Sequence, residues 1–443
     1  MNKKSITLFA IIFSILTTNG QDVSKKIDSL IEKAVKLNRF NGSVLVSKNG
    51  KIVYEKAYGY QNTEEHILNT SNTIYQIGST TKEFTAAVIL ILAEQHKLKL
   101  EDKLSEYFPE YKRGNEITIK HLLTHTSGIY EILRDHTAVS ENTLPRSKEK
   151  MLSFFISKPL DFDPGTQYSY CNSGYILLGL IIEKVTGKPY QDIVRDLILK
   201  PLKMKHTGFD FVGLNSSDKA IGYTKYNQQI YEASIPWDST ATFSAGSLYS
   251  TVKDLYLWHR GLLNYKVYKK SSMEEATTPF LQGYGLGCWI DTLYKKKIVS
   301  HGGNILGFTS YFGRIQEEDV SVILLNNIYN HQIETLGLSI FAILYDQPYS
   351  YFDEIKLSPE KLEKYVGDYE VNADYKVKIT RTGDQLFIQR NNQPKIQIFA
   401  YKENTFFQKD DDIRISFQNE KGIIKKITII EGLNTKKGDK IRL

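Results

Sequence analysis

The hydrophobic positions divide the chain into two regions with different periodicities. In the first region, residues 23–38 place apolar side chains at helical spacing. Residues 42–59 form two β-rich runs separated by Asn49-Gly50, which is a strong hairpin signal. Further helical patterns and strand-like runs follow, with helices at 84–93, 176–186 and 332–344 and strands in KKIVSHGGN, FTSYFGRI and DVSVILLNN. This order predicts one α/β unit closed by elements from both of its ends.

The pattern changes after Asp346. The segment DQPYSYFDEIKLSPE contains two prolines, and we interpret residues 346–357 as a linker. Short alternating runs separated by turn residues then take over, at residues 376–379, 386–388, 396–398, 413–417 and 427–429. Because no helical pattern lies between these runs, residues 358–443 are predicted to form a small antiparallel barrel or sandwich.

Residues 1–20 differ from the rest of the chain. Lys3 and Lys4 precede an apolar run over residues 6–16, and small residues stand ahead of Gln21. This order is typical of a signal peptide, so we expect export to the periplasm or the medium. The alternative is a buried N-terminal helix, since the run is well short of the roughly 20 residues of a membrane span. No later apolar run is long enough to cross a bilayer, so no stable membrane insertion is expected after cleavage.

The composition excludes several classes of protein. With 41% hydrophobic and 24% charged residues among 443, the chain is neither disordered nor fibrous. Its net charge of +7 is spread along the sequence, whereas nucleic-acid binding needs a concentrated basic patch, so no nucleic-acid partner is expected. Two cysteines, Cys171 and Cys288, are too few for a disulfide scaffold or a Cys-rich zinc module. Whether these two pair is left open by the sequence.

The first candidate for chemistry is an S-x-x-K pattern. It occurs five times, but only Ser79 and Lys82 introduce a long apolar helix. At this spacing the two side chains share one helix face, so the amine can reach the hydroxyl. The positive helix end favours a developing oxyanion, and a lysine on an apolar face loses hydration and becomes a neutral base. The alternative is that Ser79 caps the helix and Lys82 is solvated.

Two further motifs follow in order. Tyr170-Cys171-Asn172 stands just before the second apolar helix, where a tyrosine could move a proton and an amide could orient a substrate. His301-Gly302-Gly303-Asn304 lies on a strand whose glycines mark a place where a ligand or another backbone comes close. The alternatives are a packing tyrosine at a loop-to-helix junction and a structural histidine.

Taken together, the three motifs resemble those of active-site serine enzymes that bind penicillin. The chain resembles the serine β-lactamase and D-alanyl-D-alanine-peptidase superfamily, in the branch of class C β-lactamases and their esterase relatives. Residues 119–129, 244–255 and 284–287 match that branch too. The resemblance covers about residues 25–345 and implies a hydrolase domain at 21–345. Its fold class would be α/β (α+β), with a central antiparallel sheet flanked by helices and an all-helical subdomain. The tail, which opens with LEKYVGDY, looks like the lipocalin-like β domain of such hydrolases.

The resemblance assigns a role to each motif residue. It implies that Ser79 is the acylated nucleophile, Lys82 its base and Tyr170 the second acid–base group. Asn172 would position the substrate, and the backbone N–H groups of Ser79 and Asn304 would form the oxyanion hole. No metal or organic cofactor is required by this chemistry.

The chain departs from the family in its third motif. His301, Gly302 and Gly303, the other expected substrate-binding residues, stand where relatives carry Lys-Thr-Gly, so a permanent cation and a hydroxyl are missing. We therefore expect weak recognition of a free carboxylate, improving as the pH falls towards 6 and His301 is protonated. Cys171, which stands where many relatives have serine, is assigned no role. His125 is expected to satisfy backbone groups near the turn at Gly128.

The sequence thus predicts an exported serine hydrolase that works through an acyl-enzyme. Its partners would be small-molecule or peptide substrates, either D-amino-acid peptides of the peptidoglycan type or carboxylic esters. The alternatives are a true class C-like β-lactamase and a slowly turning over penicillin- or peptidoglycan-binding protein.

Overall fold

The computed structural model describes most of the chain, in the ranges 22–226, 231–329, 332–349, 354–391, 393–408, 413–420, 422–431 and 434–442. The predicted signal peptide, residues 1–20, and residues 350–353 of the predicted linker lie outside these ranges. The chain divides into two compact units. One comprises Met1–Lys25 and Phe40–Tyr329, and the other comprises Lys26–Arg39 and Asn330–Leu443.

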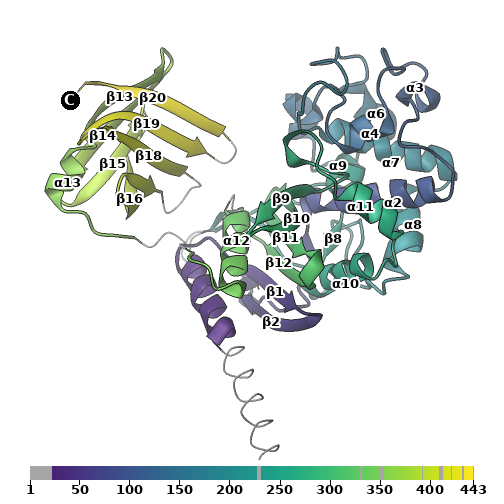
Figure 1. Ribbon diagram of the computed structural model, residues 1–443, viewed down its shortest axis with the longest axis horizontal. Coiled ribbons are helices and arrows are strands. Elements are labelled where there is room, and N and C mark those ends of the chain that lie inside the picture. The colour runs from purple at the N-terminus through teal and green to yellow at the C-terminus, as the bar shows by residue number, and fades with distance from the viewer. Residues whose placement is uncertain are drawn as a thin grey trace, which may run out of the picture. The chain divides into compact units, whose positions relative to one another are not determined.

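A six-stranded antiparallel sheet forms the centre of the first unit, in the order β2-β1-β12-β11-β10-β9 (Figure 1). Its strands are β1 (Gly42–Lys48), β2 (Lys51–Tyr58), β9 (Trp289–Leu293), β10 (Lys296–Ile305), β11 (Phe308–Ile315) and β12 (Val320–Asn326). The predicted hairpin is therefore β1 and β2, and the three predicted later strands are β10, β11 and β12. β1 pairs with β12, for example Val44 with Leu324, so strands from both ends of the unit meet inside the sheet. This confirms the expected antiparallel α/β architecture.

Two long buried helices, α2 (Thr81–Glu94) and α7 (Asn172–Thr186), pack against each other and against α9 (Ser239–Gly246). They confirm the helices predicted at 84–93 and 176–186 but begin earlier, because their first turns are polar and fall outside the apolar pattern. Those polar first turns carry Lys82 and Asn172, and Ser79 and Tyr170 lie just ahead of them. Figure 1 shows α3, α4, α6 and α7 gathered in one helical region, as expected for the all-helical subdomain.

Shorter elements complete the first unit. The helical ones are η1 (Gly78–Thr80), α3 (Leu104–Tyr107), α4 (Ile119–Leu123), η2 (Ile132–Arg134), α5 (His136–Ser140), α6 (Lys148–Ser153), α8 (Tyr190–Val194), η3 (Arg195–Leu199), α10 (Val252–Leu263), α11 (Lys270–Ala276), η4 (Leu281–Gly283) and η5 (Gln316–Glu318). The short strands are β3 (Tyr60–Asn62), β4 (Ile67–Leu68), β5 (Tyr75–Gln76), β6 (Tyr223–Tyr226), β7 (Tyr231–Ala233) and β8 (Tyr249–Ser250). α10 packs on β1 and β12, and η1 packs on β10 and β11. The sheet thereby holds the turn that carries Ser79.

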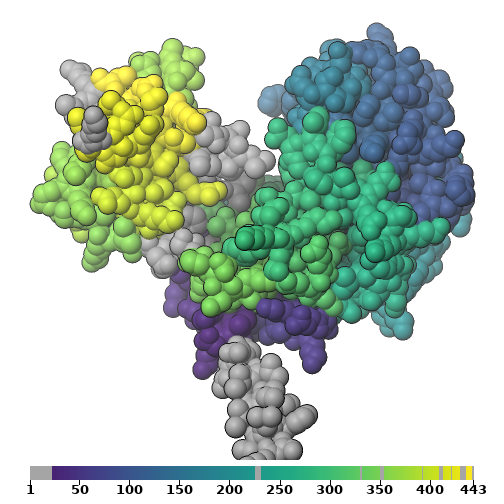
Figure 2. All heavy atoms as spheres, in the orientation of Figure 1, coloured from purple at the N-terminus to yellow at the C-terminus, as the bar shows by residue number. Residues whose placement is uncertain are grey.

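The second unit ends in a closed eight-stranded barrel. The helices of this unit include α12 (Ile333–Leu344) and α13 (Pro359–Glu363). The barrel strands are β13 (Gly367–Asn372), β14 (Tyr375–Thr382), β15 (Gln385–Arg390), β16 (Ile396–Lys402), β17 (Thr405–Phe407), β18 (Ile413–Glu420), β19 (Ile423–Glu431) and β20 (Asn434–Arg442). The predicted runs lie in five of these strands, whereas β13, β17 and β20 were not predicted from the alternating pattern. β20 is largely polar (NTKKGDKIR), so its strand character comes from pairing with β13 and β19. Figure 2 shows the last strands (yellow) lying beside the first barrel strands (light green).

Two other features of the chain bear on the sequence analysis. Cys171 and Cys288 are both free and buried, so the disulfide left open above does not form. Residues 22–36 are helical, where a helix was predicted at 23–38. Among the helices in the described ranges, none has both the length and the apolar character needed to cross a membrane.

Candidate active site

Ser79 lies in the turn η1, directly ahead of α2, where two glycines allow an unusually close approach. Gly78 has a φ of 50°, which is left-handed and favours glycine. A Cβ on Gly303 would lie 1.9 Å from the carbonyl oxygen of Ile77, so β10 can pass this close to η1 only with glycine there. A Cβ on Gly78 would lie 3.1 Å from the backbone nitrogen of Asn304. The third motif therefore runs against the turn that carries Ser79.

Lys82 is fully buried and contacts three oxygen atoms. Its Nζ lies 3.0 Å from Oγ of Ser79, 2.8 Å from Oδ1 of Asn172 and 2.8 Å from the carbonyl oxygen of Ala245. Burial is the main cause that lowers the pKa of Lys82, to about 7, and it outweighs the opposing charge of Glu131. A neutral amine has two N–H bonds and one lone pair. The amide oxygen of Asn172 and the carbonyl oxygen of Ala245 can each accept a hydrogen bond from one N–H. The lone pair is then left to take the Ser79 proton.

Glu131 fixes the amide that holds Lys82, and sequence reasoning missed it. Its carboxylate accepts from the backbone N–H of Asn172 and, at 2.9 Å, from Nδ2 of the same residue. Because Nδ2 is held by Glu131, Oδ1 of Asn172 is the atom that faces Lys82. Glu131 lies just beyond the segment 119–129 that carried the family resemblance, and no motif or periodicity marks it.

Tyr170 stands over Lys82 with its hydroxyl protonated. The Nζ of Lys82 lies 4.8 Å from the centre of the Tyr170 ring. Burial raises the pKa of Tyr170 well above its usual value, and the nearby Ser79 hydroxyl opposes that rise. The phenol oxygen is buried and has no hydrogen-bond partner within the described part of the chain. At neutral pH, Tyr170 is therefore a proton donor and not a base.

His125 holds the segment that carries Tyr170. Its Nδ1 accepts the backbone N–H of Cys171 at 3.0 Å, and its carbonyl accepts that of Ser169 at 2.9 Å. The expectation that His125 satisfies backbone groups is right in kind, but those groups flank Tyr170 instead of the turn at Gly128. The thiol of Cys171 donates to the carbonyl of Ile129 at 3.3 Å, away from Lys82.

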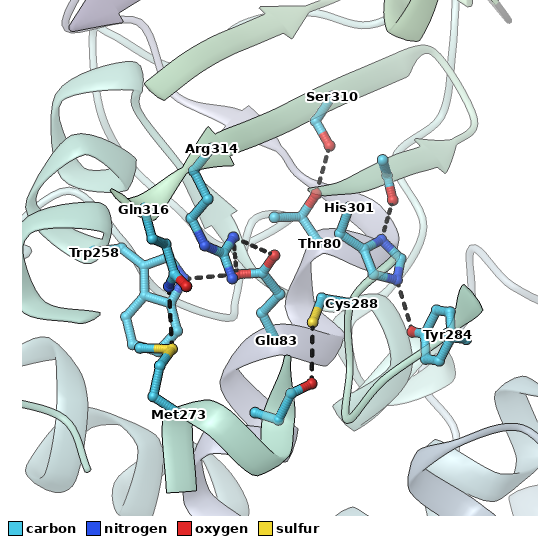
Figure 3. A network of polar contacts seen from close by, with 12 residues as sticks. Thr80, Glu83, Trp258, Met273, Tyr284, Cys288, His301, Ser310, Arg314 and Gln316 are labelled. Atoms are coloured by element: carbon cyan, nitrogen blue, oxygen red, sulfur yellow. Dashed lines mark hydrogen bonds and ion pairs between the residues drawn. The ribbon is translucent and has the colours of Figure 1, made fainter. Parts of the chain in front are cut away.

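His301 is neutral, which overturns one expectation. Its Nδ1 lies 2.6 Å from the carbonyl oxygen of Gly302, so Nδ1 carries the proton and Nε2 accepts from the Tyr284 hydroxyl at 2.9 Å (Figure 3). Burial is the main cause that lowers the pKa of His301, to about 3, and the charge of Lys82 adds to it. Protonation near pH 6, expected to improve carboxylate recognition, therefore does not occur. The expectation fails because the ring is buried beside a cation.

A polar network ties the start of α2 to the sheet (Figure 3). Nη1 of Arg314 donates to both carboxylate oxygens of Glu83, at 2.7 and 2.9 Å, and Nε1 of Trp258 donates to Glu83 at 3.0 Å. The hydroxyls of Thr80 and Ser310 lie 3.0 Å apart. The Arg314–Glu83 and Ser310–Thr80 contacts join the first turn of α2 and the turn η1 to β11. These contacts anchor the segment that carries Ser79 and Lys82 to the sheet.

We expect the Glu83–Arg314 pair to be costly to break. Replacing Glu83 by glutamine leaves a buried guanidinium uncompensated and should lower the free energy of unfolding by about 3–5 kcal/mol. The measurement is urea denaturation of the purified protein. The double change Glu83→Leu with Arg314→Met removes both charges and should cost less than the single change. A single variant as stable as the double variant would contradict this account.

The pKa of Lys82 predicts a pH profile. Since only the neutral amine can take the Ser79 proton, kcat/KM for a neutral ester should rise with pH, with a midpoint near 7. The Glu131 carboxylate raises the pKa of Lys82, so Glu131→Gln should move that midpoint to lower pH. Glu141→Gln, a change of the same kind at a carboxylate paired with Lys150, should leave the midpoint in place. A midpoint that rises in Glu131→Gln would contradict the assignment of Lys82 as the base.

Comparison with known proteins agrees with this geometry. A family model described as Beta-lactamase matches residues 27–332, and one described as a domain of unknown function, DUF3471, matches residues 353–437. The protein PbpX of Bacillus subtilis (strain 168) is 32% identical over 294 residues, which are 66% of this chain and 72% of that protein.

Two solved structures are similar as well. The octameric penicillin-binding protein homologue from Pyrococcus abyssi superposes with a TM-score of 0.69 and 26% identity, over 94% of this chain and 99% of that one. The D-stereospecific amidohydrolase from Streptomyces sp. has a TM-score of 0.57 and 25% identity, over 65% of this chain and 89% of that one. The family match spans the six-stranded sheet, the buried helices and all three motifs, and the chain therefore belongs to the β-lactamase family of serine hydrolases.

Proposed function

We propose that the first unit hydrolyses acyl compounds through an acyl-enzyme on Ser79. The observation that carries this proposal is the buried Lys82 amine, 3.0 Å from the Ser79 hydroxyl and with a pKa of about 7. In the first step Lys82 takes the Ser79 proton while Oγ forms a bond to the carbonyl carbon of the substrate. Tyr170 gives its proton to the leaving group and is reprotonated from Lys82, so the proton lost by Ser79 ends on the leaving group.

In the second half of the cycle, Lys82 takes a proton from water while the water oxygen forms a bond to the acyl carbon. The bond from that carbon to Ser79 Oγ then breaks, Lys82 returns the proton to Oγ, and the acid is released. The backbone N–H groups of Ser79 and Asn304 are the proposed oxyanion hole. The proposal is supported by the close approach of β10 to η1, which Gly78 and Gly303 permit.

For the substrate we propose esters and amides that lack a free carboxylate, including amidated D-amino-acid peptides. The third motif supplies no cation, because His301 is neutral and its ring nitrogens are engaged by Gly302 and Tyr284. The similarity to a D-stereospecific amidohydrolase supports the amide branch of this proposal. Efficient turnover of penicillins would instead favour a true class C-like β-lactamase. Stable acylation by penicillins would favour a slowly turning over penicillin- or peptidoglycan-binding protein.

We also propose that the protein is exported, on the strength of residues 1–20. The N-terminal sequence of the protein recovered from a secreting host tests this, and it should begin at or near Gln21. A product that retains residues 1–20 would contradict the proposal.

Substrate class can be tested by comparing acylation rates. Intact-protein mass after mixing with a fluorophosphonate, penicillin G and short p-nitrophenyl esters should show rapid labelling by all but penicillin G. A charge-assisted hydrogen bond is worth about 1.5–3 kcal/mol, or roughly ten- to a hundredfold. The double change His301→Lys with Gly302→Thr should therefore raise penicillin acylation by about that factor relative to ester hydrolysis.

The structure leaves room for a side chain at position 302. A Cβ on Gly302 would meet only the carbonyl oxygen of Ser310, at 3.5 Å, so Gly302→Ala serves as the matched control that adds no hydroxyl. The ratio of penicillin to ester rates in the native protein should not change between pH 8 and pH 6, because His301 stays neutral. If the native protein reacts faster with penicillin than with esters, and the double change leaves that ratio of rates the same, this account of specificity is wrong.

A further inference from the structure

A cavity of about 300 Å³ lies beside α9, and it has no assigned role. Its lining comes from α6, α7, α8 and α9 and the segments beside them, in the helical region of Figure 1. Ser79, Lys82, Tyr170 and Asn172 do not line it. Small-molecule sites begin at about 300 Å³, so the volume suits a compact ligand.

Two buried polar groups on this cavity lack partners. Arg146 is 6% exposed and Ser247 is 1% exposed. Nε of Arg146 and Oγ of Ser247 have no hydrogen-bond partner within the described ranges. A buried donor left unsatisfied costs about 1–3 kcal/mol, so an orphaned pair at a cavity wall points to a missing acceptor.

The charge of Arg146 is not neutralised at contact distance. Its Nη2 donates to the carbonyl of Ala138 at 2.6 Å, and its guanidinium carbon lies 5.0 Å from the centre of the Phe154 ring. Among the residues that the structure describes, no carboxylate forms an ion pair with it.

The nearby acids are engaged elsewhere. Burial lowers the pKa of Arg146, opposed by Glu141 and Asp135. Glu141 pairs with Lys150, and Asp135 caps α5 by accepting the backbone N–H of Ala138 at 3.1 Å. The guanidinium is therefore a buried cation with room beside it for an anion.

The remaining walls select the rest of the ligand. Met151, Tyr190, Phe209 and Phe243 give the cavity an apolar and aromatic side. Lys148 and Glu183 also line it, and their opposite charges are paired with each other. One free cation facing an apolar wall matches a molecule with a single carboxylate and an apolar body.

Phe243 connects this cavity to the catalytic lysine. It holds a φ of 40° and a ψ of −136°, a strained conformation for an aromatic residue. Two residues later, the carbonyl of Ala245 accepts from Lys82 at 2.8 Å, and the carbonyl of Ser244 accepts from Thr85 at 2.7 Å. A ligand that contacts Phe243 therefore touches the segment that holds the base.

We propose that this cavity is a binding site for a small amphipathic carboxylate, with Arg146 and Ser247 as donors to the anion and the aromatic side chains around its apolar body. Occupancy should also change the rate of Ser79 acylation through α9. That consequence rests on the proposed function, whereas the binding itself does not.

The probe for this site is 3-phenylpropanoate, with 3-phenylpropanamide as a neutral molecule of the same size. Isothermal titration calorimetry on the full chain should show the carboxylate binding about ten- to a hundredfold more tightly than the amide. Equal affinities for the two would overturn the proposal.

Variants locate the binding. Arg146→Gln should weaken carboxylate binding at least tenfold, and Arg146→Lys should retain most of it. Gln191 is exposed at the mouth of the cavity, so Gln191→Trp should block binding while the fold and Arg146 stay in place. Arg195→Gln, at an exposed arginine paired with Asp192, is the matched control and should bind normally. An affinity unchanged in Gln191→Trp would place the anion elsewhere and overturn the proposal, whatever the activity of Ser79.

Discussion

Replacing Ser79 by alanine should abolish covalent labelling and reduce ester hydrolysis by about 10⁵- to 10⁶-fold, the usual cost of losing such a nucleophile. The fold should survive, because Ser79 is only half-buried in η1, and the Thr80 hydroxyl of this turn contacts the Ser310 hydroxyl on β11 without it. The measurements are steady-state rates with a p-nitrophenyl ester and intact-protein mass after treatment with a fluorophosphonate.

The chain offers a matched control for this experiment. Ser216 and Lys219 repeat the S-x-x-K spacing, but the Lys219 ammonium donates to the carbonyl of Val212 and not to Ser216. Ser216→Ala should therefore keep full activity. Labelling that persists at full stoichiometry in Ser79→Ala would place the nucleophile at another residue.

The next largest losses should come from Lys82→Met and Tyr170→Phe, each costing about 10²- to 10⁴-fold in rate, the scale of a positioned acid–base group. Methionine keeps the length and the apolar packing of Lys82 but cannot take the Ser79 proton. Phenylalanine keeps the Tyr170 ring and removes only the hydroxyl, which has no hydrogen-bond partner within the described residues, so stability should hardly change. Both are measured as kcat/KM with the same ester.

Two substitutions control for these changes. Lys219→Met removes the amine of the Ser216–Lys219 pair. Tyr168→Phe removes another buried hydroxyl that has no hydrogen-bond partner among the residues the structure describes, from a ring that packs on Tyr284 and Trp289. Both should retain near-native rates. Near-native activity in Lys82→Met and in Tyr170→Phe would refute the proposed mechanism even with Ser79 reactive.

A variant that carries both Lys82→Met and Tyr170→Phe tests whether these two side chains act together or independently. If Lys82 and Tyr170 pass one proton between them, the double change should cost little more than the worse single change. A fully multiplicative loss would indicate two independent roles.

Local sequence patterns determined much of the secondary structure of this protein and the positions of its motifs. The hairpin at Asn49-Gly50, the buried helices and the later strands follow from periodicity and turn residues, and these are short-range properties. The motifs were visible for the same reason. Ser79 and Lys82 are three positions apart, in η1 and the first turn of α2, and Tyr170 and Asn172 flank the start of α7.

Tertiary structure decided the properties that depend on distant partners. β20 is a strand because it closes the barrel, since its own residues are polar. Glu131 reaches Asn172 across 41 positions, and no local spacing encodes that contact. His301 is neutral because it is buried beside Lys82, and burial likewise lowers the pKa of Lys82 to about 7. The sequence by itself thus determined which groups exist and in what order, whereas their protonation and orientation were decided by desolvation and by neighbours that only folding brings into contact.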